Sequence, residues 1–533
     1  MKKISQYSLI AAVSFFFVLT CNYAFFHSIM NVYPFVGKNI LFIASIGLLL
    51  FLCNFIFLTL FSSRWTTKVI LILTLMISAF TSYFMNTYNV VINDEMIRNV
   101  VQTNANESMD LFSWKLIFYV LFLGFIPSFF IWKTPLKFYG VKGDGLRKIG
   151  FILLSLTLIV LIILPQGGYF ASFFREHKPL RYQANPLYWI YSIGKYSANN
   201  VQATPLVVMP HGTDAKIPKT PEKTLVIMVV GESLRADMFG FNEKQYDTTP
   251  RLAKETDLVN FPNMHSCGTS TAYSVPCMFS QFSRSAYSYK KAQSNENVLD
   301  VLSHAGVKVL WRDNNSDSKG VALRVQYEDF KTTKNNQDCD IECRDIGMLK
   351  GLKHFIAHNK QDNILIVLHQ MGNHGPEYFK RYPKGFEKFQ PVCKTNQLES
   401  CSPESIRNAY ANAALYTDYF LDATIQLLKS YSSHYKTALL YMSDHGENLG
   451  EDGIYLHGLP YLIAPEAQTH VASFLWLGKD MQKRINEAKL KAYASQSFNQ
   501  DYVYSTLLDL FDVKTNAYNP TLDILKPAVI GSP

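Results

Sequence analysis

Acidic and imidazole side chains in this sequence recur directly after short apolar segments. Gly231-Glu232-Ser233 follows one such segment, and Ser443-Asp444-His445 follows another. Asn315 and Lys319 follow a third apolar segment, and His369 and His374 follow a fourth. Glu447 and His457 lie two and twelve residues beyond His445. Carboxylate and imidazole groups are the ligands that zinc and similar divalent ions prefer. These residue types therefore predict a metal site, provided that the fold brings the segments together.

A cluster of hydroxyl groups offers a candidate nucleophile for such a site. Residues 267–277 read CGTSTAYSVPC, and Thr269, Ser270, Thr271 and Ser274 lie between the two cysteines. A Ser or Thr hydroxyl is a weak nucleophile until a base or a metal lowers its pKa. At the start of a helix it would also lie among free backbone N–H groups, which bind phosphate oxygens. The spacing leaves the choice among the four hydroxyls open, and a Ser/Thr-rich capping turn is the simpler alternative.

The segments that precede these residues are predicted to be strands of a largely parallel sheet. Five short, β-rich runs alternate with helical patterns: Leu225–Val230, Val307–Trp311, Ile364–Leu368, Ala438–Met442 and Phe474–Leu477. Such an alternation is typical of an α/β domain with helices on both faces of its sheet. Ligands of these sheets bind beyond the carboxyl ends of the strands. The candidate metal ligands should therefore meet at one edge of one sheet.

The first third of the chain is much more apolar. Five stretches are long enough to cross about 30 Å of hydrocarbon at about 1.5 Å per helical residue; they are 7–26, 40–61, 69–88, 116–132 and 149–164. Nine basic residues fall on one side of these spans: Lys2, Lys3, Arg64, Lys68, Lys133, Lys137, Lys142, Arg147 and Lys148. Three fall on the other side: Lys38, Arg98 and Lys115. Because basic loops stay cytoplasmic, the N-terminus is predicted to be inside and the chain after the fifth span outside.

The topology predicts three regions. Residues 1–165 form a membrane domain, residues 166–223 a linker on the external surface of the membrane, and residues 224–533 an external domain, which lies in the periplasm or the extracellular space. The formal charge of the chain is +9. Residues 1–165 hold 12 basic and 5 acidic side chains, which is +7 and leaves +2 for the rest. The basic excess is therefore a topology signal, and we expect no nucleic-acid partner.

Two external segments have open alternatives. The aromatic run Leu187–Tyr191 favours the membrane interface, although an ordinary packed segment fits it equally well. Apolar residues within 92–101 have helical spacing, so that this segment could lie in the interface or cover the spans.

The cysteines agree with an external second half. Cys21 and Cys53 lie in predicted spans, whereas the other six form close pairs, Cys267 with Cys277, Cys339 with Cys343, and Cys393 with Cys401. Proximity favours these local disulfides among the 15 connectivities that six cysteines allow. Disulfides persist in oxidising compartments. A zinc ribbon is the weaker alternative, because the spacings do not form paired CxxC knuckles.

The sequence resembles the phosphoethanolamine transferases of Gram-negative inner membranes, in particular the lipid A-modifying branch that includes the mobile colistin-resistance enzymes. The resemblance covers nearly the whole chain. It is carried by long motifs: Val230–Asp237, Ser266–Ser280, Trp311–Gly320, His369–Gly375, Ser443–Gly450 and His457-Gly458. It implies five spans followed by an α/β domain of the alkaline-phosphatase and sulfatase type with a largely parallel central sheet.

The resemblance also implies roles for single residues. It implies one tightly bound zinc ion whose ligands are Glu232, Asp444, His445 and Thr271, with Thr271 also the nucleophile. The family's second cluster, which is linked to phosphate and to a further zinc, is matched by His374 and His457, with His369 nearby. Positions that line the phosphoethanolamine pocket are matched by Asn315, Lys319, Tyr273 and Glu447. The chain departs from close relatives at 281–286, which holds no carboxylate where they carry an acidic residue.

The implied reaction is a double displacement. Thr271 takes phosphoethanolamine from phosphatidylethanolamine as a phosphothreonine, and a phosphate of lipid A then accepts it. Masking lipid A phosphate with a cationic group would weaken the attraction of polymyxin and other cationic peptides. We expect a monomer whose partners are the donor lipid, lipid A and the membrane.

Several other functions are weighed against this one. The acceptor could be a lipopolysaccharide core sugar or another envelope component, and a phosphoglycerol transferase has the same general plan. A sulfatase needs C/S-x-P-x-R, whereas Met278 stands where the arginine would be. A non-catalytic envelope sensor or scaffold would have no need of the full set of metal ligands and nucleophile.

Overall fold

A computed structural model of the chain describes residues 3–103, 105–175, 177–201, 207–243 and 245–530. The chain forms two compact units. The first comprises Met1–Ile97 and Phe112–Asn200, and the second comprises Arg98–Leu111 and Val201–Pro533. This division follows compactness. The boundaries at residues 165 and 223 follow membrane topology and stay a prediction.

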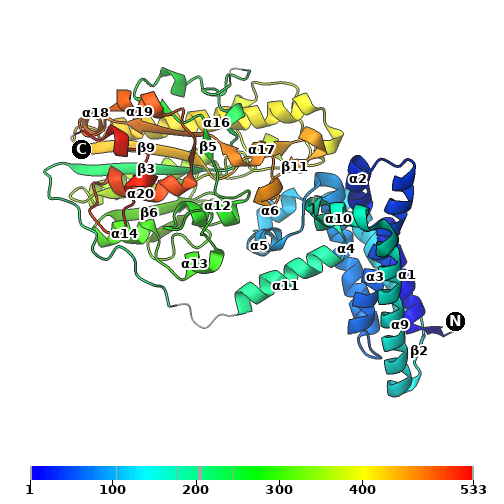
Figure 1. Ribbon diagram of the computed structural model, residues 1–533. Helices are drawn as coiled ribbons and strands as arrows, with labels where there is room; N and C mark the ends of the chain where they lie inside the picture. The colour runs from blue at the N-terminus through cyan, green and yellow to red at the C-terminus, as the bar shows by residue number, and fades with distance from the viewer. Residues whose placement is uncertain (1–2, 104, 176, 202–206, 244, 531–533) are drawn as a thin grey trace. The chain divides into compact units, whose positions relative to one another are not determined.

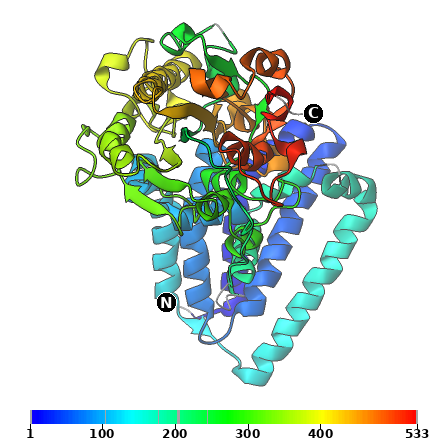
Figure 2. The same cartoon turned by 90° about the vertical axis from the view of Figure 1, so that its left-hand side faces the viewer.

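The first unit is helical, and its long helices run side by side (Figure 2). Four described helices are long and apolar enough to cross a membrane: α3 (Lys38–Phe61), α4 (Thr67–Tyr88), the continuous helix Trp114–Lys133, and Gly140–Phe170, which begins with α9 (Gly140–Ile163). A bent pair, α1 (Gln6–Thr20) and α2 (Tyr23–Val32), makes five if it counts as one span. The predicted membrane domain is thus present, with its first span broken.

The break in the first span has a local cause. Helices α1 and α2 meet at an angle of 55°. Between them the Asn22 side chain donates to the carbonyl of Phe17 at 2.9 Å and to that of Asn185 at 2.7 Å. A polar side chain that enters the helical hydrogen-bond ladder is a recognised cause of such kinks.

The aromatic run that was predicted to lie at the interface or to pack belongs to α11 (Leu187–Val201). Its Trp189 is buried in the first unit and donates through Nε1 to Asn185 Oδ1 at 3.1 Å. Tyr191, two residues further, is 62% exposed. The Trp189 face of the segment is therefore packed, whereas the Tyr191 face is exposed.

The second unit is built on a seven-stranded sheet of order β4-β13-β9-β3-β8-β6-β7. Figure 1 labels β9, β3 and β6 of this sheet. The five strands from β9 to β7 are parallel: β9 (Tyr435–Ser443), β3 (Lys223–Gly231), β8 (Ile364–His369), β6 (Lys308–Asp313) and β7 (Gln326–Asp329). The other two, β13 (Ser473–Leu477) and β4 (Leu258–Asn260), are antiparallel to their neighbours. The predicted sheet is present, and Phe474–Leu477 is its antiparallel member.

Alternating side chains of the central strand enter two hydrophobic cores. Val226, Met228 and Val230 face one core, which also includes residues of α14 (Val298–His304) and α20 (Val503–Leu510). The intervening residues Leu225, Ile227 and Val229 face the other, together with α16 (Pro403–Lys429). Figure 1 shows α16 on one side of the sheet and α14 with α20 on the other. Burial on both faces explains the continuous apolar run of β3.

The strand register places the polar residues at one edge. Gly231 of β3 pairs with Ser443 of β9, and Val230 pairs with His369 of β8. His369 in turn pairs with Asp313 of β6. The residues that follow these four strands therefore emerge at the same level, as the sequence predicted.

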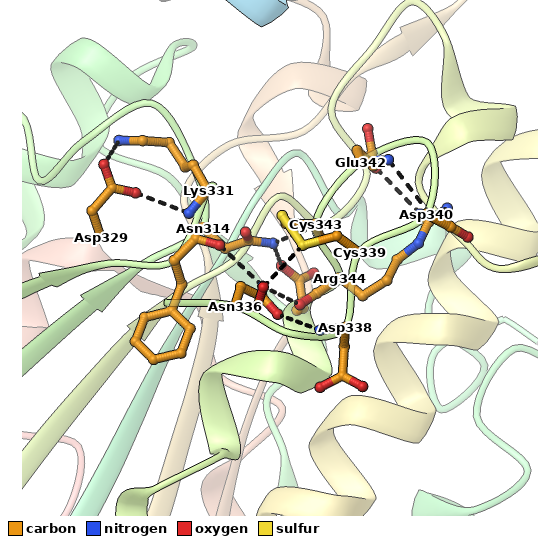
Figure 3. The surroundings of a disulfide bond; sticks show 12 residues. Asn314, Asp329, Lys331, Asn336, Asp338, Cys339, Asp340, Glu342, Cys343 and Arg344 are labelled. Carbon is orange, nitrogen blue, oxygen red and sulfur yellow. Dashed lines mark hydrogen bonds and ion pairs between the residues drawn. A yellow bond between two sulfur atoms is a disulfide. The ribbon is translucent and has the colours of Figure 1, made fainter. Parts of the chain in front are cut away.

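The second unit contains three disulfides among its described residues, and they are the local pairs that were expected: Cys267–Cys277, Cys339–Cys343 and Cys393–Cys401. The first closes the loop that carries the candidate hydroxyls. Figure 3 shows the surroundings of the second.

Candidate active site and metal centre

Three buried ionisable side chains lie close together at the carboxyl ends of β3 and β9. Glu232, Asp444 and His445 each have 0% exposure, and one ligand atom from each lies within 4.8 Å of the others. Asp444 Oδ1 accepts the main-chain N–H groups of Ser233 and His445 at 3.1 and 2.7 Å. Its Oδ2 accepts no hydrogen bond from the described residues. Buried charges are costly unless they are paired or bind a metal, so this arrangement fits a cation.

Thr271 lies against this group. It is the first residue of α12 (Thr271–Met278), and its Oγ1 donates to Glu232 Oε2 at 2.9 Å. The same oxygen is 3.2 Å from His445 Nε2. Because His445 Nδ1 lies 2.9 Å from the carbonyl of Gly446 and can donate to it, Nε2 is free to present its lone pair to the cluster.

The structure separates Thr271 from the other three candidate hydroxyls. Thr269 donates to the carbonyl of Leu459 at 2.6 Å, and Ser274 Oγ accepts the N–H of Gly268 at 2.9 Å. Ser270 is the N-cap of α12, and its hydroxyl has no hydrogen-bond partner among the described residues. Of the four, Thr271 is the one within hydrogen-bond distance of the Glu232 carboxylate.

The donor set is that of a borderline divalent ion. Two carboxylates, one imidazole and one hydroxyl converge, and Asp444 Oδ2 accepts no hydrogen bond from the described residues, although His445 Nε2 lies 3.5 Å from it. Burial and the neighbouring charge of Glu232 raise the pKa of Asp444 to about 6. Burial also acts to raise the pKa of Glu232, but the charges of His445, His374 and His457 outweigh it and lower that pKa. The group therefore favours a positive charge, and the structure supports a candidate metal site here.

A second cluster adjoins the first. His445, Glu447 and His457 form another set whose ligand atoms lie within 4.8 Å. Glu447 Oε2 is 3.0 Å from His457 Nδ1, and its Oε1 accepts the hydroxyl of Tyr378 at 3.1 Å. Burial lowers the pKa of His457, but the charge of Glu447 more than compensates and raises it to about 9. Glu447, expected at the phosphoethanolamine pocket, thus lies in the histidine cluster.

His374 lies beside this cluster, and His369 lies at the end of β8. The ring centroid of His374 is 5.9 Å from that of His457, and its buried Nδ1 has no partner among the described residues. His369 is fully buried at the end of β8, where Nδ1 lies 2.9 Å from Asp313 Oδ2. The same carboxylate oxygen accepts Trp311 Nε1 at 2.9 Å. The partner role of Asp313 was missed from the sequence, although Asp313 lies two residues beyond the predicted strand Val307–Trp311 and ends the observed β6.

The remaining predicted residues have different surroundings. Asn315 Nδ2 donates to Glu232 Oε2 at 2.9 Å and to the carbonyl of Gln370 at 2.7 Å, so it holds a candidate metal ligand. Lys319 is buried, and it lines a cavity of about 200 Å³ together with Pro276 and Tyr289. The ring of Tyr273 packs edge-on against Tyr287 with the centroids 4.9 Å apart.

The loop after β8 packs closely against Glu232. Gly372 has φ +51°, and a Cβ there would lie 2.9 Å from the carbonyl oxygen and 3.0 Å from the nitrogen of Glu232. The Asn373 N–H also donates to that carbonyl at 3.0 Å. Only glycine fits this backbone conformation and this approach without strain.

We therefore expect Gly372→Ala to destabilise the protein by about 2 kcal/mol, within the range of about 1–3 kcal/mol for a strained backbone, and to lower activity because Glu232 must shift. Gly385→Ala is the matched control, since its Cβ would meet no atom within 4 Å. Two measurements on the full chain in detergent test this prediction: the midpoint of thermal unfolding and the reaction rate. Equal midpoints and equal rates for the two variants would contradict it.

Comparisons with known proteins agree with this geometry. The family model of phosphoethanolamine transferase EptA/EptB matches residues 50–201, and the sulfatase model matches residues 224–513. The chain is 43% identical to phosphatidylethanolamine transferase Mcr-1 of Escherichia coli, over 96% of each chain. It is 37% identical to phosphoethanolamine transferase EptA of Salmonella typhimurium, over 98% of this chain and 97% of that one.

Solved structures show the same relationship. The integral membrane lipooligosaccharide phosphoethanolamine transferase A of Neisseria meningitidis matches with a TM-score of 0.95 and 33% identity, covering 99% of this chain and 100% of its own. The C-terminal periplasmic domain of phosphoethanolamine transferase EptC from Campylobacter jejuni matches 60% of this chain with a TM-score of 0.54 and 40% identity. The chain is a multi-pass inner-membrane protein with its catalytic domain in the periplasm. It belongs to the phosphoethanolamine transferase family, whose catalytic domain is of the sulfatase type.

Proposed function

We propose that this protein transfers phosphoethanolamine from phosphatidylethanolamine to a phosphate of lipid A, with Thr271 as the covalent nucleophile. The observation that carries the proposal is the position of Thr271 Oγ1, 2.9 Å from Glu232 Oε2 and 3.2 Å from His445 Nε2 at the start of α12. Family membership supplies the donor group, since the relatives are named for phosphoethanolamine transfer.

Glu232, Asp444, His445 and Thr271 are the residues that would hold a zinc ion, and the cluster of His374, His457 and Glu447 could hold a second. When bound, zinc supplies Lewis-acid stabilisation of phosphoryl charge and lowers the pKa of the attacking hydroxyl. The orphaned Asp444 Oδ2 and the convergence of three fully buried ionisable groups support this assignment. We propose a monomer, because each of these groups comes from one chain.

In the first half-reaction, Thr271 Oγ1 attacks phosphorus as its proton passes to a neighbouring base. Glu232 Oε2 and His445 Nε2 are both within hydrogen-bond distance of that oxygen, at 2.9 and 3.2 Å. The bond from phosphorus to the diacylglycerol oxygen breaks, and that oxygen leaves as an alcohol after protonation. When the histidine cluster holds no second zinc, His457 would donate that proton, because the charge of Glu447 outweighs burial and raises its pKa to about 9. Phosphoethanolamine then remains on Thr271 as a phosphodiester.

In the second half-reaction, an oxygen of a lipid A phosphate attacks the same phosphorus, the bond from phosphorus to Thr271 Oγ1 breaks, and Oγ1 takes back the proton held by the neighbouring base. The backbone N–H groups at the start of α12, together with Lys319, His374 and His457, would stabilise the equatorial oxygens in both steps. Asn315 would fix the Glu232 carboxylate through its bond of 2.9 Å. Both substrates are lipids, so membrane spans in the same chain raise their effective concentration at the site.

Mass spectrometry of lipid A from Gram-negative cells that express the chain tests the proposal. We expect phosphoethanolamine on a lipid A phosphate, together with reduced killing by polymyxin, because the added ammonium weakens the attraction of cationic peptides. Cells that express Thr271→Ala are the control. Unmodified lipid A together with a modified core sugar would show that the core sugar is the acceptor. Added phosphoglycerol would instead indicate a phosphoglycerol transferase.

A further inference from the structure

A short segment between two membrane spans packs with the catalytic unit. Arg98–Leu111 lies in sequence between α4 and the helix Trp114–Lys133, yet it clusters with the second unit and not with the first. It includes the end of α5 (Asp94–Gln102) and α6 (Ala105–Asp110). At its beginning, the Arg98 guanidinium lies 3.8 Å from the ring centroid of Tyr289, whose hydroxyl accepts Gln102 Nε2 at 3.1 Å.

The other end of the segment is held by charge. The Asp110 carboxylate accepts Lys380 Nζ at 2.8 Å and an Arg381 terminal nitrogen at 2.5 Å. The main-chain oxygen of Asp110 accepts Asn396 Nδ2 at 2.9 Å. Burial acts to raise the pKa of Asp110, but Arg381 and Lys380 outweigh it and lower that pKa, so the carboxylate is charged at neutral pH.

Arg381 connects Asp110 to the site. Its side chain is 1% exposed. Nε donates to the main-chain oxygen of His374 at 2.7 Å, one terminal nitrogen pairs with Asp110, and the other pairs with Glu342. The guanidinium is planar and presents its donors in a fixed fork. Movement of any one of these three contacts therefore displaces the donors of the other two. A change at Asp110 therefore reaches the backbone of His374 through a single rigid group.

The third contact of Arg381 comes from a disulfide loop. Glu342 lies between Cys339 and Cys343, where it also pairs with Arg344, and Arg344 pairs with Asp340 (Figure 3). Arg344 further donates to the carbonyl of Lys380 at 2.5 Å. The loop thus fixes one side of Arg381, and Asp110 provides the opposing carboxylate.

We propose that Asp110 is a positioning residue, which acts through Arg381 to hold His374 in place in the histidine cluster. Docking of the segment between the spans is then required for full activity of the periplasmic site. The inference rests on the proposed function, because the role of His374 belongs to that function. Asp110 would thus affect the reaction rate although it is not one of the proposed metal ligands.

Asp110→Asn tests this in the full-length protein, reconstituted in nanodiscs that contain acyl-fluorescent phosphatidylethanolamine and lipid A. Release of fluorescent diacylglycerol reports turnover. We expect kcat to fall at least about tenfold while KM for the donor changes less than about twofold, since a misplacement of about 1 Å can cost about 100-fold in rate. The matched control is Asp94→Asn, an acidic residue of α5 that pairs with Lys195 in the first unit; it should retain the wild-type kcat.

Arg381→Lys is the second variant, and it covers the case in which Asp110→Asn does not fold. Lysine keeps a positive charge near Asp110 and Glu342 but lacks the Nε donor to His374. We expect a similar loss of kcat, and less than additive losses in the double variant because both changes act through one contact. A wild-type kcat in either folded variant, or an equal loss in Asp94→Asn, overturns the proposal. Absence of turnover in the wild type would instead refute the proposed function.

Discussion

Thr271→Ala is expected to reduce the rate of phosphoethanolamine transfer by on the order of 10⁴-fold or more, since removal of a covalent nucleophile elsewhere costs about 10⁶-fold. The change removes the one hydroxyl that contacts the Glu232 carboxylate among the four candidates in the loop. It should leave the fold intact, because the loop stays closed by Cys267–Cys277 and the lost hydrogen bond is worth about 1 kcal/mol. Lipid A mass spectrometry and turnover of the purified protein measure the effect.

Two variants serve as controls for this result. Thr271→Ser keeps a hydroxyl and should retain part of the activity. Thr269→Ala removes a hydroxyl that donates to the carbonyl of Leu459, so it should lower stability by about 1 kcal/mol and leave turnover within a few-fold of wild type. Activity that survives Thr271→Ala but is lost in Thr269→Ala or Ser274→Ala would place the nucleophile elsewhere in the loop.

The second large effect is expected for Asp444→Asn. The Asn amide oxygen can still accept the N–H groups of Ser233 and His445, as Asp444 Oδ1 does at 3.1 and 2.7 Å. The amide nitrogen replaces Oδ2, which has no hydrogen-bond donor among the described residues and is the free ligand oxygen. An NH₂ group cannot bind a cation, so we expect bound zinc to fall from about one equivalent to near zero and turnover to fall on the order of 10³-fold or more.

Asp418→Asn is the matched control for this change. Asp418 is also buried and accepts two main-chain N–H groups, from Leu252 at 2.9 Å and Arg251 at 3.1 Å. Burial raises its pKa to about 7, so loss of its charge is inexpensive at neutral pH. Metal content measured by plasma mass spectrometry should be unchanged in Asp418→Asn. Full zinc occupancy in Asp444→Asn would contradict the assignment.

The central sheet was predictable because its strands are buried on both faces. The runs in β3, β6, β8 and β9 are apolar, and the register of parallel strands brings their following residues to one edge. The edge strands were not found. Residues Gln326–Asp329 of β7 are polar, because this strand has a neighbour on one side only. The antiparallel direction of β13 could not be predicted either, because its residues are as apolar as those of the parallel strands.

The candidate site was predictable where chemistry lies next to a strand end. Glu232 and Asp444 follow a strand directly and His445 comes one residue later, so sequence and register together place them. Local spacing could not choose Thr271 among its neighbours, since that choice depends on which side chain α12 turns toward Glu232. Local spacing also gave no sign that His369, buried at the end of β8, pairs with Asp313.

Contacts between distant segments were beyond the reach of local pattern. Asp110 and Arg381 are 271 residues apart in sequence, and neither stands next to a predicted strand. The helical spacing of 92–101 predicted a segment that lies in the interface or covers the spans, whereas the part from Arg98 onward packs with the catalytic unit. Such a contact follows from the tertiary structure, in which the buried Arg381 meets the partly buried Asp110.

Covalent loading of Thr271 is the most direct test of the account. Full-length protein in detergent is incubated with phosphatidylethanolamine and no acceptor, then digested and analysed by tandem mass spectrometry. We expect about one diacylglycerol released per protein and phosphoethanolamine on Thr271, which lipid A then removes. An adduct on Thr269, Ser270 or Ser274, or transfer to lipid A without any prior adduct or diacylglycerol release, would contradict it.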